Sequence, residues 1–454
     1  MATPPDEEFQ LSLEETQALE KDLVFLDSNI PSTSGKRKVS GALLTPPSSQ
    51  GSVSGSSSSS ASVRFRSFNS SPDFTLDLPR SAISIDALEF IGFTAETAAD
   101  IFRRFTSRPD PDINCYDLLD YVHGHTSILS TASYQHYPPA QAMTQIGLTQ
   151  KMQDAILDPR FSTIFGTETL RFWIDDTLRI NYLTLMQLLR RLKNHATGSI
   201  AKKKKAKRAK LEGVFPPKTS SFPQQATTTA TLNVMPEDYY LPKDFVAVDT
   251  PSEVLEDYYV LYKAKAAAEM GDPQWIQDDG SLEMSAIATH GGGDFNHLNA
   301  AWYWTPEAET AEMYRAWAAR RCPWSDTWVI RIQIPKTFID SLRQQDLWYS
   351  KDWKEYVWYC RKKIRPPEKF NSYWQAGEVE LIKGHICSTF HSSITRIKKD
   401  EVQTKITEDN VLLIGSGRAT QWAFMQDDSI ERLGAEIRGK IHIEITSAEQ
   451  GQEK

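Results

Sequence analysis

One segment in the C-terminal half sets the order of three structural elements. Residues 291–320 read GGGDFNHLNAAWYWTPEAETAEMYRAWAAR. This pattern predicts a glycine-rich turn, a short aromatic strand over residues 302–304 and a helix from Glu307 onward. We expect Thr305 to be the N-cap, because its side-chain oxygen can accept from a free backbone N–H, and Pro306 to fill the first helical position, where no N–H is needed. Aromatic side chains beside a tight turn are suited to the wall of a ligand cleft.

The whole chain is long enough for two or more domains, because 454 residues are more than one hydrophobic core usually includes. Most of the 12 tryptophans lie between Trp275 and Trp422, so the densest core is expected in the C-terminal half. The net charge of -8 argues against nucleic-acid binding over the whole surface, although a local basic patch remains compatible with it.

Composition also limits the compartment and the chemistry. The four cysteines form no CxxC pair and have no zinc-like spacing to histidine, so we expect buried thiols and no metal site. The acidic N-terminus does not resemble a secretory signal, and no uncharged apolar run reaches about 18 residues. We therefore expect an intracellular, soluble protein with no membrane partner.

Residues 1–80 are predicted to be a disordered tail, since their Ser, Pro and charge content offers little apolar surface to bury. The alternative for its start is a short amphipathic helix that carries Leu11, Leu13, Leu19, Leu23 and Phe25 and binds a partner. A basic cluster, Gly35-Lys36-Arg37-Lys38, lies within the tail. Thr45-Pro46 and Ser71-Pro72 are minimal sites for proline-directed phosphorylation, which would add negative charge beside that cluster.

Residues 81–198 predict a small all-helical unit that could bind a protein partner. Apolar side chains recur at helical spacing over residues 87–105, with a break at 92–94, and again over residues 181–192. These apolar stripes are more typical of a core than of cofactor contacts. No catalytic pattern is present in this part.

Residues 199–235 are predicted to be a basic and Pro/Thr-rich linker. Its most economical interpretation is a nuclear-import signal, which places the protein in the nucleus and makes an import receptor a partner. Non-specific phosphate or nucleic-acid binding and a merely solvated linker are the alternatives. The import residues would be Lys202, Lys203, Lys204, Lys205, Lys207, Arg208 and Lys210.

Residues 236–447 predict an α+β domain, followed by a disordered tail at 448–454. Strand patterns occur at residues 258–262, 327–334, 379–382 and 421–424, and an aromatic helix is predicted at 353–360. Strands and helices therefore mix along this half.

The order of motifs in this domain resembles the ADP-ribosyltransferase-like fold, in a divergent branch. Leu261-Tyr262-Lys263 is followed by Gly293-Asp294-Phe295 and then by Trp302-Tyr303-Trp304-Thr305 opening a helix, with a late strand at Gln421. Relatives carry a strand ending in Leu-Tyr-His, an Asp-Phe turn, a Phe-Tyr-x-Thr strand and a late strand bearing Glu or Gln. The resemblance covers roughly the last half of the chain.

This resemblance implies a split, antiparallel-rich β core with flanking helices around a cleft that binds NAD by its nicotinamide end. Tyr303 would stack on the nicotinamide ring. The catalytic positions would be Lys263, Tyr303 and Gln421. The cofactor would contact Tyr262, Asp294, Phe295, Tyr303 and Thr305.

Two departures from the family weaken the expected chemistry. Lys263 stands where relatives place a histidine, and its positive charge has the wrong sign to stabilise a cationic sugar. Gln421 stands where active transferases place a glutamate, and its neutral amide supplies no countercharge. Glu378 and Glu380 are candidates for a replacement carboxylate.

Two main functional hypotheses remain open at this point, and a third, an active transferase or NAD hydrolase, requires a carboxylate that replaces the one Gln421 lacks. The first is a nuclear protein whose divergent ADP-ribosyltransferase-like domain binds NAD or a related nucleotide, with weak or absent transferase or NAD-glycohydrolase activity. The second is a non-enzymatic nuclear regulator or scaffold that binds protein or nucleic acid through its helical unit and basic linker. The first hypothesis requires Tyr303, Lys263 and Gln421 to converge on one pocket.

Overall fold

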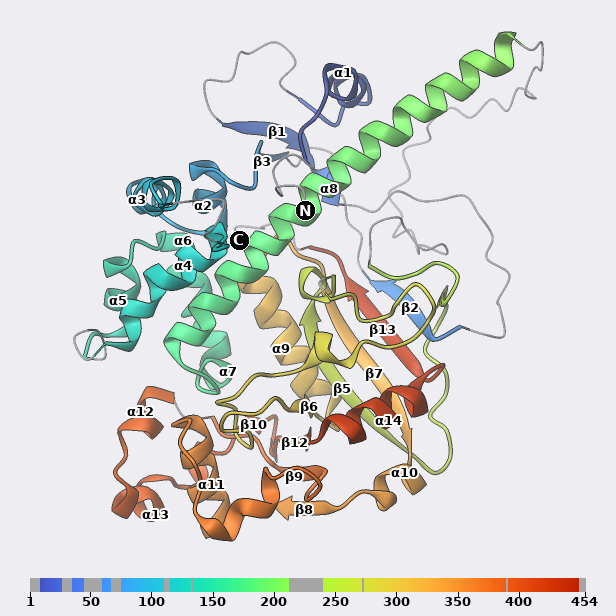
Figure 1. Cartoon of the computed structure of the whole chain (residues 1–454). Coiled ribbons are helices and arrows are strands. Elements are labelled where there is room, and N and C mark those ends of the chain that lie inside the picture. The colour runs from blue at the N-terminus through green and yellow to red at the C-terminus, as the bar shows by residue number, and fades with distance from the viewer. Residues whose placement is uncertain are drawn as a thin grey trace.

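The fold is known from a computed structural model of the whole chain (Figure 1). It describes residues 9–26, 35–44, 59–66, 75–109, 115–131, 134, 136–211, 240–271, 273–388 and 391–448. Within these ranges the architecture is mixed α and β with antiparallel-rich sheets, as the sequence predicts.

The larger sheet has the strand order β4-β2-β13-β7-β5. Antiparallel pairing joins β13 to β7 and β7 to β5, whereas β4, β2 and β13 run parallel to one another. Every residue of β7 except Arg331 and Pro335 is buried, because helices and loops cover both of its faces. The strands are β2 (Ala61–Arg66), β4 (Val246–Val248), β5 (Tyr258–Ala266), β7 (Thr327–Pro335) and β13 (Ile441–Thr446).

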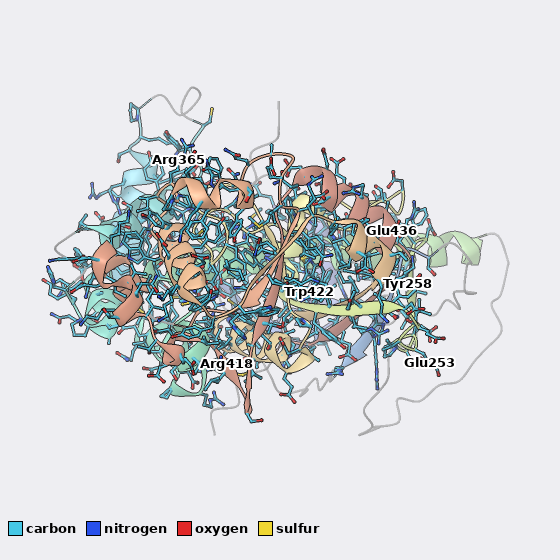
Figure 2. All side chains as sticks on the ribbon, turned by 90° about the horizontal axis from the view of Figure 1, so that it is seen from below. Glu253, Tyr258, Arg365, Arg418, Trp422 and Glu436 are labelled. Carbon is cyan, nitrogen blue, oxygen red and sulfur yellow. The ribbon has the colours of Figure 1, made fainter. Side chains whose placement is uncertain are left out.

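The second sheet has the order β6-β12-β9-β8 and meets the first at its β6 edge. The junction is a pair of backbone hydrogen bonds between Tyr262 and Thr305, with N···O distances of 2.7 and 3.0 Å. Figure 2 places Trp422, on β12, near the middle of the molecule, with Tyr258 of β5 towards one edge. The strands are β6 (Trp302–Trp304), β8 (Gln344–Leu347), β9 (Leu381–His385) and β12 (Thr420–Phe424).

Helices of the C-terminal half pack around these sheets. They are α9 (Ala308–Arg321), α10 (Lys336–Ser341), α11 (Lys351–Arg361), α12 (His391–Arg396), α13 (Val402–Lys405) and α14 (Asp427–Ile437), with a small β10 (Leu413–Ile414) and β11 (Gly417–Arg418) ribbon. The helix predicted from Glu307 begins at Ala308, with Glu307 and not Thr305 as its N-cap. The Thr305 hydroxyl instead accepts from the Glu307 N–H at 3.2 Å, so it stabilises the turn just before the helix.

The helical unit predicted for residues 81–198 is present. Its first two helices are separated at Gly92, whose φ of 128° ends the first one, as the predicted break requires. The unit packs on the C-terminal half, because Trp173 shares a core with Trp317 of α9. Its helices are α2 (Ile85–Ile91), α3 (Ala95–Thr106), α4 (Leu118–Thr126), α5 (Pro139–Gln145), α6 (Gln150–Ile156), α7 (Ser162–Phe165) and α8 (Leu170–Leu211).

The prediction of a disordered tail over residues 1–80 is wrong for the described parts of that range. The strand β2 lies between β4 and β13, and Val63 on it is fully buried. The helix α1 (Leu13–Lys21) packs on α8, and β1 (Lys36–Ser40) pairs with β3 (Thr75–Pro79). These segments are short, and they bury their few apolar residues against partners distant in the sequence.

The linker prediction is also wrong at its start. The helix α8 continues through residues 199–211, because Ala, Lys and Arg are strong helix formers. Its far end projects beyond the other elements in Figure 1. The remainder of the predicted linker, and residues 449–454 of the predicted C-terminal tail, lie outside the described residues.

Candidate functional site: a cavity between the helical unit and the sheets

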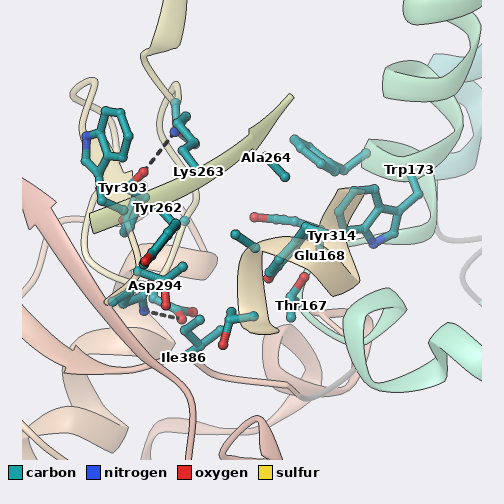
Figure 3. Close-up of a pocket in the computed structure, with 18 of the residues that line it drawn as sticks. Thr167, Glu168, Trp173, Tyr262, Lys263, Ala264, Asp294, Tyr303, Tyr314 and Ile386 are labelled. Atoms are coloured by element: carbon teal, nitrogen blue, oxygen red, sulfur yellow. Dashed lines mark hydrogen bonds between the residues drawn. The ribbon is translucent and has the colours of Figure 1, made fainter. Parts of the chain in front are cut away.

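A cavity of about 210 Å³ lies where the helical unit meets both sheets. Strands β5, β6 and β12 and the turn at residues 289–294 line it from the C-terminal half, as does the side of α9. The residues that link α7 to α8, together with the start of α8, close it from the helical unit. Figure 3 shows Tyr262, Lys263 and Tyr303 on one side, and Glu168, Tyr314 and Trp173 on the other.

The structure brings together nearly all of the site residues predicted from the sequence. Lys263, Tyr303 and Gln421 line this cavity, and so do Tyr262, Asp294 and Thr305. Phe295 does not line it. Its ring is fully buried in the core beside α11, with its centre 6.4 Å from that of Tyr303.

The side chain of Tyr303 is held by two hydrogen bonds at its hydroxyl. Its hydroxyl accepts from the Phe295 N–H at 2.9 Å and donates to Asn296 Oδ1 at 2.8 Å. A Cβ at Gly293 would lie 2.9 Å from this hydroxyl and 2.6 Å from Asn296 Oδ1, so the turn needs glycine there. Burial, and secondarily the charge of Asp294, raise the pKa of Tyr303, which keeps the phenol neutral.

Lys263 places an amine at the cavity. Its Nζ donates to the carbonyl of Tyr303 at 2.9 Å and lies 5.9 Å from the centre of the Trp304 ring. Burial lowers the pKa of Lys263 to about 7; the charge of Lys265 adds to this effect and that of Glu269 opposes it. A substantial share of these amines is therefore neutral at physiological pH.

Asp294 is the centre of a buried polar network. Its Oδ1 accepts from Arg361 Nε at 2.7 Å, while its Oδ2 accepts from the Cys387 N–H at 2.8 Å and from Gln421 Nε2 at 2.7 Å. Gln421 Nε2 also donates to the His385 carbonyl at 3.2 Å. The position of Gln421 thus suits an amide donor, because a carboxylate there would face Asp294.

Glu168 is a cavity residue that the sequence analysis missed. It lies between α7 and α8, and its carboxyl group faces the cavity from the side opposite Lys263 (Figure 3). Burial raises the pKa of Glu168 to about 7; Arg361 opposes this shift and Asp294 adds to it. No local pattern singles out Glu168, which belongs to the helical unit and reaches the cavity only through tertiary packing.

Glu380, a predicted alternative carboxylate, is used elsewhere. It is buried, forms ion pairs with Arg343 and Arg432, and accepts from the Arg343 N–H at 3.0 Å. Neither Glu380 nor Glu378 lines the cavity. In the described residues, no group of three or more His, Cys, Asp or Glu side chains is arranged to hold a metal ion.

The predicted import residues all fall on the last part of α8. The side chains of Lys202, Lys203 and Lys204 are exposed, and Lys204 Nζ lies 3.7 Å from Glu14 of α1. The backbone of residues 205–211 is helical. The basic run is therefore part of a helix.

Searches for relatives return none: no family model, no curated protein and no solved structure matches this chain. Within the described ranges, none of the helices is both long enough and apolar enough to cross a bilayer.

Proposed function

We propose that the C-terminal half is a divergent ADP-ribosyltransferase-like domain that binds NAD or a related ligand by its nicotinamide end, with weak or absent transferase activity. The observation that carries this proposal is the convergence of Lys263, Tyr303 and Gln421 on one cavity. These residues come from three different strands. A split pair of antiparallel-rich sheets, joined at Tyr262 and Thr305 beside the cavity, also fits the family architecture.

The dimensions and lining favour a single aromatic ring as the buried part of the ligand. The cavity volume of about 210 Å³ is below the roughly 300–1,000 Å³ typical of sites for drug-sized ligands. Tyr303 provides a fixed aromatic ring, and Phe172, Trp173 and Tyr314 add aromatic surface across the cavity. Such walls suit stacking on a flat ring, while the rest of a dinucleotide would lie outside.

The charges around the cavity account for the low activity that we propose. Cleavage of the nicotinamide–ribose bond develops positive charge on the sugar, which a free carboxylate would stabilise. Asp294 is neutralised by Arg361, and Gln421 is uncharged. Glu168 is the remaining carboxyl group in the cavity lining, and its raised pKa leaves it protonated in part of the molecules at neutral pH.

Thermal-shift titrations of the full chain with NAD, nicotinamide and ADP-ribose test the binding proposal. A ligand that binds only the folded state raises its stability, so NAD and nicotinamide are expected to raise the melting temperature and ADP-ribose to raise it less. Ala264→Leu, which fills the cavity, should abolish the shift, whereas Ala308→Leu, on the exposed start of α9, should not. Identical curves with and without millimolar ligand would refute the proposal.

One observation supports nuclear import, which both functional hypotheses include. The far end of α8 projects beyond the other elements (Figure 1), and the side chains of Lys202, Lys203 and Lys204 are exposed. We propose that this segment directs nuclear import. A fluorescent fusion with residues 202–205 changed to alanine is expected to stay outside the nucleus, and an unchanged nuclear signal would reject import through this segment.

A further inference from the structure

A second cavity, of about 180 Å³, lies among the N-terminal segment, the β1–β3 ribbon and α8. Two arginines, Arg37 and Arg80, line it beside an apolar floor. The floor is formed by the buried side chains of Phe9, Leu78, Leu189 and Leu192. No part of this cavity belongs to the proposed NAD site.

The strand register places both guanidinium groups on the same side of the ribbon. Arg37 pairs with Leu78 across the antiparallel ladder, and Arg80 follows Leu78 by two residues. Arg80 is the first residue after β3, and its N–H donates to the Gly35 carbonyl at 2.9 Å, which continues the pairing and puts Arg80 on the cavity side with Leu78 and Arg37. Lys38 pairs with Asp77 and faces the other way.

The basic cluster of residues 35–38 is therefore divided by the fold. Lys36 forms ion pairs with Glu89 at 2.5 Å and Asp86 at 3.6 Å, so its charge is balanced. Arg37 is half-buried, and its guanidinium lies 5.0 Å from the centre of the Phe25 ring. Within the described ranges, neither Arg37 nor Arg80 forms an ion pair with a carboxylate.

The two arginines interact unfavourably without a ligand. Burial lowers the pKa of Arg37, the charge of Arg80 lowers it further, and Glu20 opposes the shift. Two like charges that line one partly apolar cavity are stabilised when an anion bridges them. The site therefore has the charge and the shape of an anion receptor.

We propose that this cavity binds a phosphate monoester, held by Arg37 and Arg80. A phosphate monoester carries about -1.5 to -2 charges at pH 7 and three acceptor oxygens, which match two guanidinium groups, whereas a carboxylate leaves one of them unbalanced. The apolar floor contacts the organic part of the ester. The ester is either a separate molecule or a phosphorylated residue of this chain, for which Thr45-Pro46 and Ser71-Pro72 are the candidates; both lie outside the described residues.

Calorimetric titration of the unphosphorylated full chain with phenyl phosphate tests this site, with benzoate as the singly charged comparison. Phenyl phosphate is expected to bind more tightly than benzoate. Its affinity should rise between pH 5 and pH 7, as the second phosphate proton leaves with a pKa near 6.

Matched substitutions distinguish binding at this site from non-specific attraction by positive charge. Arg37→Gln and Arg80→Gln should each weaken phenyl phosphate binding by roughly ten- to a hundredfold. Lys38→Gln, which removes the same charge from the opposite face of β1, should leave it unchanged. Arg80 is exposed, so its replacement should affect folding very little. If Arg37→Gln fails to fold, Arg80→Gln still tests the site. Absent binding, or equal weakening in all three variants, would overturn the proposal.

A third titration identifies the source of the phosphate. The full chain is phosphorylated with a proline-directed kinase and titrated again with phenyl phosphate. Blocked binding that returns in a Thr45→Ala/Ser71→Ala variant assigns the site to the chain's own phosphate. Undiminished binding assigns it to a separate phosphate monoester.

Discussion

At the scale of single residues, the amide of Gln421 is fixed by its contact with Asp294 at 2.7 Å. A Gln421→Glu substitution restores the residue type of active relatives, but it replaces a donor by a second carboxylate beside Asp294. We expect no gain of NAD cleavage and a loss of about 2–4 kcal/mol in the free energy of unfolding. Urea denaturation and an NAD-hydrolysis assay measure the two effects.

Gln403→Glu serves as the control for this substitution. Gln403 is exposed and donates to the Lys351 carbonyl at 3.0 Å. Its replacement should change stability very little. A stable and active Gln421→Glu protein would show that Asp294 does not set the requirement for an amide.

Glu168 gives a pH dependence to the proposed NAD binding. As pH rises from 6 to 8, Glu168 gains negative charge and Lys263 loses positive charge, since both have a pKa of about 7. Both changes favour the cationic nicotinamide ring; Arg361, Asp294 and Lys363 are the charged groups that also act on Glu168. Affinity should rise roughly fivefold, the effect of an interaction of about 1 kcal/mol.

Titrations of NAD at pH 6 and pH 8 measure this rise. Glu168→Gln should reduce it, and the double variant Glu168→Gln/Lys263→Met should bind equally at both values. A wild-type affinity that falls with pH would contradict the assignment of these two groups to the ligand site.

Lys263 also affects stability as a function of pH. Its pKa is about 7 in the folded chain and 10.5 in the reference state, so the unfolded chain binds more protons between these values and stability rises with pH across that range. Lys263→Met removes this dependence. Its stability relative to the wild type should therefore be highest near pH 6 and should decline towards pH 9, as urea denaturation at the two values can measure. A pH-independent difference would argue against a depressed pKa.

At the scale of elements, the strand β2 makes the N-terminal region part of the larger sheet and therefore necessary for its stability. Val63 is fully buried between β13 and β4, so Val63→Ala should cost about 2 kcal/mol in the free energy of unfolding. Arg64→Ala, on the exposed face of the same strand, should cost little. Denaturant unfolding of the two variants makes the comparison, and equal stabilities would argue against β2 as part of the sheet.

Local patterns were sufficient for some elements and not for others. The break at Gly92 and the helix α11 were predictable, because helix caps, the φ angle that glycine allows and the spacing of apolar side chains all depend on residues close together in the sequence. The strand β2 was not, because it follows a serine-rich run and its partner strand begins at Ile441, near the other end of the chain. Lys263, Tyr303 and Gln421 were predicted as cavity residues through the resemblance in motif order, whereas Glu168 reaches the cavity through packing between two units.

At the scale of the whole molecule, the contact between the helical unit and the C-terminal half is a continuous core. The rings of Trp173 and Trp317 lie with their centres 4.3 Å apart, and Arg321 covers Trp317 at 4.6 Å while pairing with Asp176 at 2.8 Å. Such buried contacts favour cooperative unfolding. We expect one calorimetric transition for the full chain.

Trp317→Ala tests this coupling. It should lower the free energy of unfolding by about 3–5 kcal/mol and divide the transition into two, because the Trp317 ring packs against the helical unit as well as its own half. Phe172→Ala, at a 40% exposed ring of the same helical unit, should keep a single transition. Two transitions already present in the wild type would show that the units unfold independently.

The continuity of α8 has a mechanical consequence. Its 42 residues make a rod of about 63 Å that starts two residues after Glu168 and ends in the lysine-rich segment. Packing on α1 and α2 holds the middle of this rod, so it cannot pivot as a whole about its base. The helix therefore acts as a fixed spacer that keeps the lysine-rich end apart from the cavity beside Glu168.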